Sequence, residues 1–201
     1  MTHGPTSPRP RWFTDTKDGH SEWYVERFRT MAAEGKDLAG EARLIDAMVS
    51  PGSRVLDAGC GPGRVGSELH ARGHTIVGAD ADPVLIAAAA EDHPGPRWVV
   101  ADLSDLDLDE QPFDIAVMAG NVMVFLAPHS EQQVLSRLRA HMRPGGRIVV
   151  GFATDRDYEL VAFDADVVAA GLTLEQRFAT WDLVPFSDES DFAVSVLRVP
   201  E

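Results

Sequence analysis

A glycine-rich segment, Ser53 to Gly66 (SRVLDAGCGPGRVG), most constrains what this chain can fold into. Its first half is a short apolar run that ends in Asp57, as expected for the end of a buried strand. Gly59, Gly61 and Gly63 then allow the backbone to turn tightly and to approach a ligand closely. A helical pattern follows. The segment therefore predicts a strand, a turn and a helix of an α/β fold, with free backbone N–H groups facing a ligand.

The identity of that ligand depends on Asp57. The spacing Gly61-x-Gly63-x-x-Gly66 fits a dinucleotide fingerprint, in which a pyrophosphate lies at the N-terminus of the helix. A carboxylate two residues before the first glycine would repel that anion, but it would attract a ligand with positive charge at the same place. S-adenosylmethionine carries an ammonium and a sulfonium. A turn without a ligand is disfavoured, because three glycines in five residues cost chain entropy and add no packing.

The stretch VLDAGCGPG resembles the first motif, hhhDhGxGxG, of class I S-adenosylmethionine-dependent methyltransferases. The resemblance implies that the turn lies against the methionine part of the cofactor. It assigns cofactor contacts to five positions of this motif: Asp57, Ala58, Gly59, Gly61 and Gly63. A nicotinamide oxidoreductase remains the alternative from a different enzyme class.

Length, charge and cysteine content restrict the function further. The 201 residues suit a single domain with a tail. The formal net charge of −14 argues against nucleic acid as a partner, because such binding relies on Lys and Arg contacts to phosphate. Cys60 is the only cysteine, which suits a reducing cytosol, and no apolar run approaches the ~18 residues of a membrane span. We expect a cytoplasmic protein that contacts no membrane and acts on a small-molecule acceptor.

The N-terminal quarter of the chain divides into two parts. Residues 1–19 contain scattered prolines without an apolar period, so we expect a flexible tail, although Trp12 and Phe13 could dock on the domain. Residues 20–50 have helical periodicity. The resemblance implies a helical cap here over the cofactor, and it makes Tyr24 and Arg29 candidate contacts. Residues 51–201 would form the Rossmann-like core.

Two further acids stand at predicted strand ends. Asp80 closes the strand 74–80, 23 residues after Asp57, and Asp102 follows the strand 97–101. A carboxylate after the second strand can accept two hydrogen bonds from ribose hydroxyls, which makes Asp80 and Ala81 cofactor candidates. The resemblance assigns the adenine contact to Asp102 and Leu103. Asp82 is expected instead to cap the helix that begins at Pro83.

The predicted strand 113–117 ends in MAGNVMVFL. In the family this strand end meets the sulfonium, and its backbone carbonyls hold the ammonium, which makes Ala119, Gly120 and Asn121 candidates. Asn121 is followed by Val and Met and not by the Pro-Pro of nucleobase methyltransferases. The acids that hold magnesium in catechol-type enzymes are also missing, so we predict no metal.

The end of the chain favours the methyltransferase fold over an oxidoreductase fold. Residues 172–181 and 191–199 alternate as two strands of a terminal hairpin. The resemblance implies a doubly wound seven-stranded sheet of order 3-2-1-4-5-7-6, with strand 7 antiparallel and helices on both faces.

The expected reaction is in-line transfer of the methyl group, which leaves S-adenosylhomocysteine as product, in a monomer or homodimer. Alignment and desolvation can supply most of the acceleration. A general base is optional, and His129, just past the fourth strand, is the candidate. A non-catalytic module that only binds S-adenosylmethionine is a further alternative.

Overall fold

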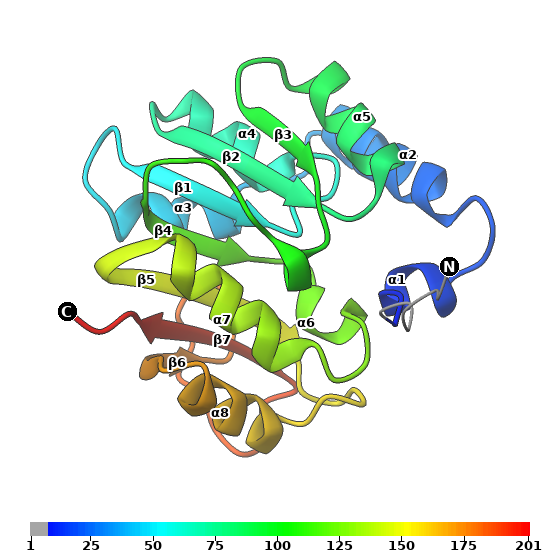
Figure 1. Cartoon of the computed structure of the whole chain (residues 1–201). Coiled ribbons are helices and arrows are strands. Elements are labelled where there is room, and N and C mark those ends of the chain that lie inside the picture. The colour runs from blue at the N-terminus through cyan, green and yellow to red at the C-terminus, as the bar shows by residue number, and fades with distance from the viewer. Residues whose placement is uncertain (1–7) are drawn as a thin grey trace, which may run out of the picture.

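The structure is a computed structural model that describes residues 8–201. One seven-stranded sheet runs through the molecule in the order β3-β2-β1-β4-β5-β7-β6 (Figure 1). The neighbours from β3 to β5 are parallel, and β7 is antiparallel to both β5 and β6. The predicted topology is therefore confirmed. The strands are β1 Arg54–Ala58, β2 Thr75–Asp80, β3 Arg97–Val100, β4 Phe113–Met118, β5 Met142–Ala153, β6 Thr173–Phe178 and β7 Phe192–Arg198.

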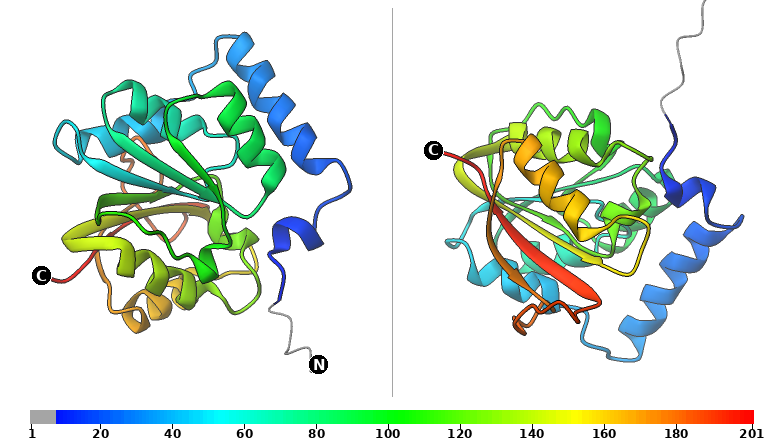
Figure 2. Two further views of the ribbon diagram at one scale, coloured as in Figure 1. Left: turned by 45° about the horizontal axis from the view of Figure 1, so that its top comes forward. Right: turned by 90° about the horizontal axis from the view of Figure 1, so that it is seen from below.

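Helices cover both faces of the sheet, as Figure 2 shows from two further sides. They are α1 Arg11–Thr14, α2 His20–Ala33, α3 Gly40–Ala47, α4 Arg64–Ala71, α5 Pro83–Asp92, α6 Val122–Phe125, α7 Glu131–His141 and α8 Leu160–Ala169, with a 3-10 turn at Leu103–Asp105. In the described residues 8–201, no helix is long and apolar enough to cross a bilayer.

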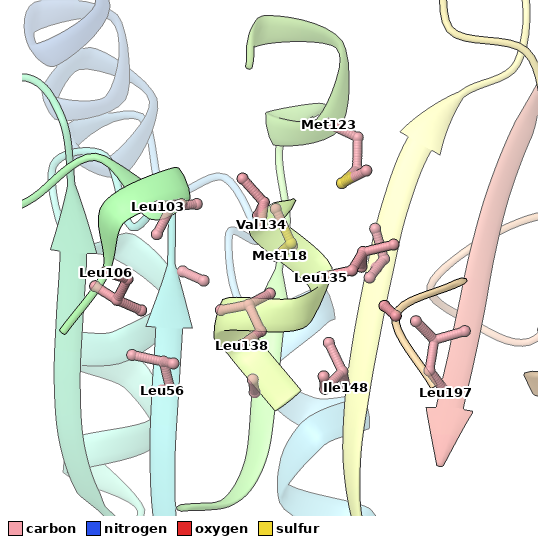
Figure 3. Packing of buried hydrophobic residues seen from close by; sticks show 14 of the residues in the cluster. Leu56, Leu103, Leu106, Met118, Met123, Val134, Leu135, Leu138, Ile148 and Leu197 are labelled. Atoms are coloured by element: carbon pink, nitrogen blue, oxygen red, sulfur yellow. The ribbon is translucent and has the colours of Figure 1, made fainter. Parts of the chain in front are cut away.

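Adjacent residues of β1 show how the core is divided. Leu56 packs with α7 and α8 on one face of the sheet, in the cluster of Figure 3, whereas Val55 packs with α3 and α4 on the other. Because successive side chains of a strand point to opposite faces, a strand buried on both faces needs a continuous apolar run. This requirement explains why successive apolar residues occupy the middle of these strands, at Val55-Leu56 in β1 and at 115–118 in β4.

The parallel strands β1, β2 and β4 end at one edge of the sheet. Asp57 is level with Gly78 of β2 and with Val117 of β4, and Asp80 is level with Val100 of β3. The predicted acids are brought to one edge because parallel strands end together, as expected at the ligand-binding edge of open α/β sheets.

The structure shows three features that the sequence analysis does not predict. Residues 11–14, inside the predicted tail, form α1, and residues 1–7 of that tail lie outside the described residues. The short helix α6 follows β4 without having been predicted. The Pro144-Gly145-Gly146 turn lies inside an extended β5, where the pairing with β4 shifts register and Gly145 has a φ of 68°.

Candidate functional site

The glycine turn between β1 and α4 is held by backbone and carboxylate contacts. The Gly59 N–H donates to the carbonyl of Ala79 at 2.7 Å, and the Gly61 N–H donates to Oδ2 of Asp80 at 2.9 Å. Both glycines have positive φ, 74° and 54°, a region that favours glycine. Asp80 therefore shapes the turn and is itself fixed beside it.

Asp57 lies beneath the turn and is only 2% exposed. Its Oδ2 accepts a hydrogen bond of 2.8 Å from the Gly66 N–H in the first turn of α4. Burial raises the pKa of Asp57 to about 7, although the Gly66 N–H and nearby Arg64 act in the opposite direction. This carboxyl group occupies the helix N-terminus where a dinucleotide pyrophosphate would bind. The geometry thus disfavours the dinucleotide alternative.

The other two strand-end acids are also fixed by backbone N–H groups. Oδ1 of Asp80 accepts from the Asp82 N–H at 2.9 Å, and burial raises the pKa of Asp80 to about 6. Oδ1 of Asp102 accepts from the backbone N–H and the hydroxyl of Ser104, at 2.9 and 2.8 Å. Within residues 8–201, no group donates to Oδ2 of Asp102, so that oxygen can accept a hydrogen bond from a ligand.

A cleft opens along these strand ends, at the place where open α/β sheets bind their ligands. Nine of the predicted cofactor residues line it: Tyr24, Gly59, Gly61, Asp80, Ala81, Asp102, Leu103, Ala119 and Gly120. Six residues without a predicted contact complete the walls: Pro10, Trp12, Leu85, Val122, Phe125 and Leu126. The aromatic Trp12 in a polar segment and the apolar run after β4 were the available sequence signals for four of these.

Tyr24 of α2 lies in the cleft between the glycine turn and the end of β4. A Cβ atom built on Gly61 would lie 3.7 Å from Cε1 of Tyr24, and one built on Gly120 would lie 3.7 Å from its hydroxyl. Tyr24 thus bridges the ends of β1 and β4. Burial raises the pKa of its phenol, so it stays protonated at neutral pH.

Below Tyr24 the cleft continues into a smaller hollow lined by Asp57, Phe28 and Arg64. The Arg64 guanidinium donates to both carboxylate oxygens of Glu41, at 2.7 and 2.6 Å, and to the carbonyl of Leu38 at 2.5 Å. This arginine was not predicted. Only the position of Arg64 at the start of α4, next to the glycine motif, could have suggested it.

Arg29 is not in the cleft, contrary to expectation. Its guanidinium donates to both carboxylate oxygens of Asp92, at 2.8 and 3.0 Å, and to Glu26 at 2.8 Å on the outer face of α2. Because α2 turns a new face every residue, Tyr24 and Arg29, five positions apart, point in different directions.

His129 also lies outside the cleft. It is exposed in the loop before α7, with a left-handed φ of 66°, and does not contribute to the lining. Asn121 does not line the cleft either: its Oδ1 accepts from the Ala153 N–H at 2.8 Å and so ties the start of α6 to the end of β5.

Ala58 and Gly63 of the glycine motif do not line the cleft, contrary to expectation, and contribute to packing instead. Ala58 is fully buried in the sheet core. Gly63 faces the indole of Trp98 from β3, 2.9 Å from where a Cβ atom would stand. Gly66 and Gly78 meet the same indole, so a ring from β3 fills the space that three glycines leave. The fingerprint spacing of Gly63 and Gly66 therefore has a structural explanation within this chain.

Nothing in residues 8–201 groups three or more His, Cys, Asp or Glu side chains as a metal site would need. His74, four residues after His70, instead pairs with Asp46 at 2.9 Å.

Comparison with known proteins identifies a family. A family model described as a methyltransferase domain matches residues 55–146. A TehB-like SAM-dependent methyltransferase from Corynebacterium glutamicum, known from its crystal structure, is 45% identical, with a TM-score of 0.86. The match covers 90% of this chain and 98% of that one.

Two curated relatives match over a shorter part of their length. EEF1A lysine methyltransferase 4 of Mus musculus is 27% identical over 64% of this chain and 58% of its own. Trans-aconitate 2-methyltransferase of Azoarcus sp. is 33% identical over 65% of this chain and 47% of its own. The chain spans about half the length of these curated relatives. The near-complete match to the Corynebacterium protein, together with the sheet order, shows that the chain belongs to the class I SAM-dependent methyltransferases.

Proposed function

We propose that this chain transfers the methyl group of S-adenosylmethionine to a small-molecule acceptor. One observation carries the proposal: strand-end carboxylates, a glycine turn and a tyrosine from the helical cap line one cleft. Asp80 and Ala81 would hold the ribose, and Asp102 with Leu103 would hold the adenine.

The residues at the other end of the cleft suit the methionine part. The open space between Gly61, Gly120 and Tyr24 suits a chain-like group, because a Cβ at either glycine would narrow it. The Asp57 carboxyl group lines the adjoining hollow, and the carbonyls after β4 at Ala119 and Gly120 are hydrogen-bond acceptors for an ammonium. We include these positions in the proposed site, with Arg64 as an additional residue of its wall.

Bound S-adenosylmethionine supplies a methyl carbon already activated by the sulfonium. The work left to the chain is to bind, to orient the acceptor and to exclude water. Trp12 of α1 and Tyr24 of α2 cover the cleft, and Val122 and Phe125 of α6 form another part of its wall. No histidine of the described chain lines the cleft. Since Tyr24 keeps its proton at neutral pH, we expect an acceptor that needs little help from a base.

Two features favour a small acceptor over a macromolecule. The cap packs against the core, with α2 on α5 and α3 on α4, and Tyr24 of α2 forms part of the wall of the cleft, which leaves less open surface for a macromolecule. The net charge of −14 also opposes nucleic acid. We propose that residues 20–50 and 51–201 act as one unit.

Calorimetry with S-adenosylhomocysteine and with NADH tests the cofactor. We expect the former to bind, and we expect Asp102→Asn to weaken it about tenfold, because an amide N–H would then face the ligand amino group. The exposed Asp105→Asn is the matched control and should leave affinity unchanged. Binding of NADH alone would refute the proposal.

The acceptor is tested with S-adenosylmethionine labelled in its methyl group and incubated with a cell extract. We expect label in the acid-soluble metabolites. Label only in precipitated protein would favour a protein acceptor, as the name of the mouse relative indicates for that enzyme. Cofactor binding without any transfer would favour a non-catalytic module.

A further inference from the structure

The N-terminal segment 8–19 forms one wall of the cleft without belonging to the sheet or its covering helices. It contributes Pro10 and Trp12 to the lining, and Figure 1 shows α1 beside α6 and apart from α2. The Arg11 N–H donates to the carbonyl of Leu126 at 3.4 Å, and the Arg11 guanidinium lies 3.6 Å from Glu131. No residue of α1 is buried. Segments with so little burial open at low free-energy cost.

Asp82 is the point at which this segment is fastened to the core. It is 2% exposed, and its Oδ1 caps α5 by accepting from the Val84 N–H at 2.8 Å. Its Oδ2 accepts from the indole Nε1–H of Trp12 at 2.7 Å and also from the hydroxyl of Ser21 at the start of α2. One carboxylate oxygen therefore holds both ends of the connection between α1 and α2.

Asp82 is also linked, through its backbone, to the proposed ribose site. The backbone N–H of Asp82 donates to Oδ1 of Asp80 at 2.9 Å. The Trp12 ring meets Tyr24 and Phe125 edge to face, with centroids 5.3 and 5.5 Å apart. Trp12 therefore touches the cap and α6 across the cleft, while Asp82 joins it to the strand-end acids.

The connection between α1 and α2 can absorb a movement. Residues 15–19 run over the surface, and Gly19 adopts a left-handed φ of 78° at the start of α2. Figure 2 shows this loop outside the body of the domain. Contacts between segment 8–19 and the core are concentrated at Arg11 and Trp12, and Ser21 of α2 shares the Asp82 oxygen with Trp12.

We propose that Asp82 is a positioning residue that holds Trp12 closed over the cofactor, and that segment 8–19 opens for cofactor exchange. The inference rests on the proposed S-adenosylmethionine site. Asp82 acts through the indole N–H of Trp12 and does not touch the reacting atoms. Its effect should therefore appear in the rates of ligand entry and release more than in the fold.

Asp82→Asn tests this role while it preserves the helix cap, since asparagine caps as well as aspartate. With its oxygen on the Val84 N–H, the amide turns its NH₂ group toward the indole N–H of Trp12, so the cap is kept and the Trp12 hydrogen bond is lost. Release of radiolabelled S-adenosylhomocysteine into excess unlabelled ligand should become about tenfold faster, because a hydrogen bond to a charged group is lost. The association rate should stay the same or rise. Asp166→Asn is the matched control and should leave both rates unchanged, because that carboxylate accepts from the Tyr158 hydroxyl away from the cleft lining.

Trp12→Phe keeps an aromatic ring in the wall but removes the N–H together with part of the indole, and we expect release about fivefold faster. The double variant should be no faster than Asp82→Asn alone, because both changes break one interaction. Additive effects, a slower association rate, or unchanged release in both single variants would overturn the proposal.

Trypsin cleavage after Arg11 and Lys17 separates this proposal from the cofactor proposal. Asp82→Asn should accelerate cleavage severalfold without any ligand, and unchanged cleavage would refute the fastening. If S-adenosylhomocysteine fails to bind while cleavage still accelerates, the fastening stands and the cofactor proposal falls.

Discussion

The glycine turn and the N-terminal segment both wall the cleft, but they are built in opposite ways. The turn is buried among β1, β2 and β3, with Asp57 bonded to α4 and the Trp98 indole packed against Gly63 and Gly66. Segment 8–19 buries no residue of its helix and depends on a few contacts to Asp82 and α6. The floor of the site, which is the glycine turn, is therefore part of the core. Its cover, formed by segment 8–19 and the adjoining cap helix α2, is a separate and less firmly held layer.

The strongest test of this contrast removes the indole behind the turn. Trp98→Ala should lower the free energy of unfolding by about 3 kcal/mol, because three glycines would then face a cavity. Urea denaturation measures the loss. Trp23→Ala is the matched control in the cap, where the side chain is 53% exposed, and its cost should stay near 0.5 kcal/mol. Equal costs would break the distinction between floor and cover.

A second test uses the burial of Asp57, whose pKa is raised to about 7. An aspartate in the unfolded chain titrates near ~3.9, so the folded chain binds more protons between these values. The contribution of Asp57 to the free energy of unfolding therefore decreases as the pH rises from about 5 to 7. Asp57→Asn removes this loss, and the variant should gain about 2 kcal/mol relative to the wild type across that window.

Urea denaturation of both chains at the two pH values measures that gain. A difference between them that is independent of pH would show that the carboxyl under the turn is not buried as described.

The smallest expected effect lies in the cover. Tyr24→Phe should weaken S-adenosylhomocysteine binding about fivefold, since one hydroxyl near Gly120 is lost and the ring remains. Isothermal calorimetry checks the change. Tyr158→Phe is the matched control, because that hydroxyl bonds to Asp166 at 2.7 Å away from the cleft lining. A loss of tenfold or more would show that the cover contributes as much to ligand affinity as the floor of the site does.

The turn could be predicted from the sequence because its contacts are local. Asp57, Gly59 and Gly61 lie within five residues, and their conformations follow from backbone rules for strand, glycine and helix start. The spacing of Asp80 and Asp102 was informative for a similar reason, since parallel strands of regular length end at one edge. Asp82 caps α5 as predicted.

The side chains from the cap could not be assigned in this way. Whether Tyr24 or Arg29 faces the cleft depends on the rotation of α2 about its axis, and this rotation is set by packing against α5. Arg29 met Asp92, 63 residues away, and left the site. His129 shows the same limit, because a loop position says nothing about the direction of a side chain.

The sequence alone determined the sheet, the family motif and the strand-end acids, because these depend on short-range periodicity and on backbone geometry that each segment carries with it. Only the tertiary structure decided that Gly63 makes room for the Trp98 indole, that Arg64 and not Arg29 lines the site, and that Trp12 donates a hydrogen bond to Asp82. Those outcomes depend on contacts between residues tens of positions apart, which are selected by the packing of the whole chain.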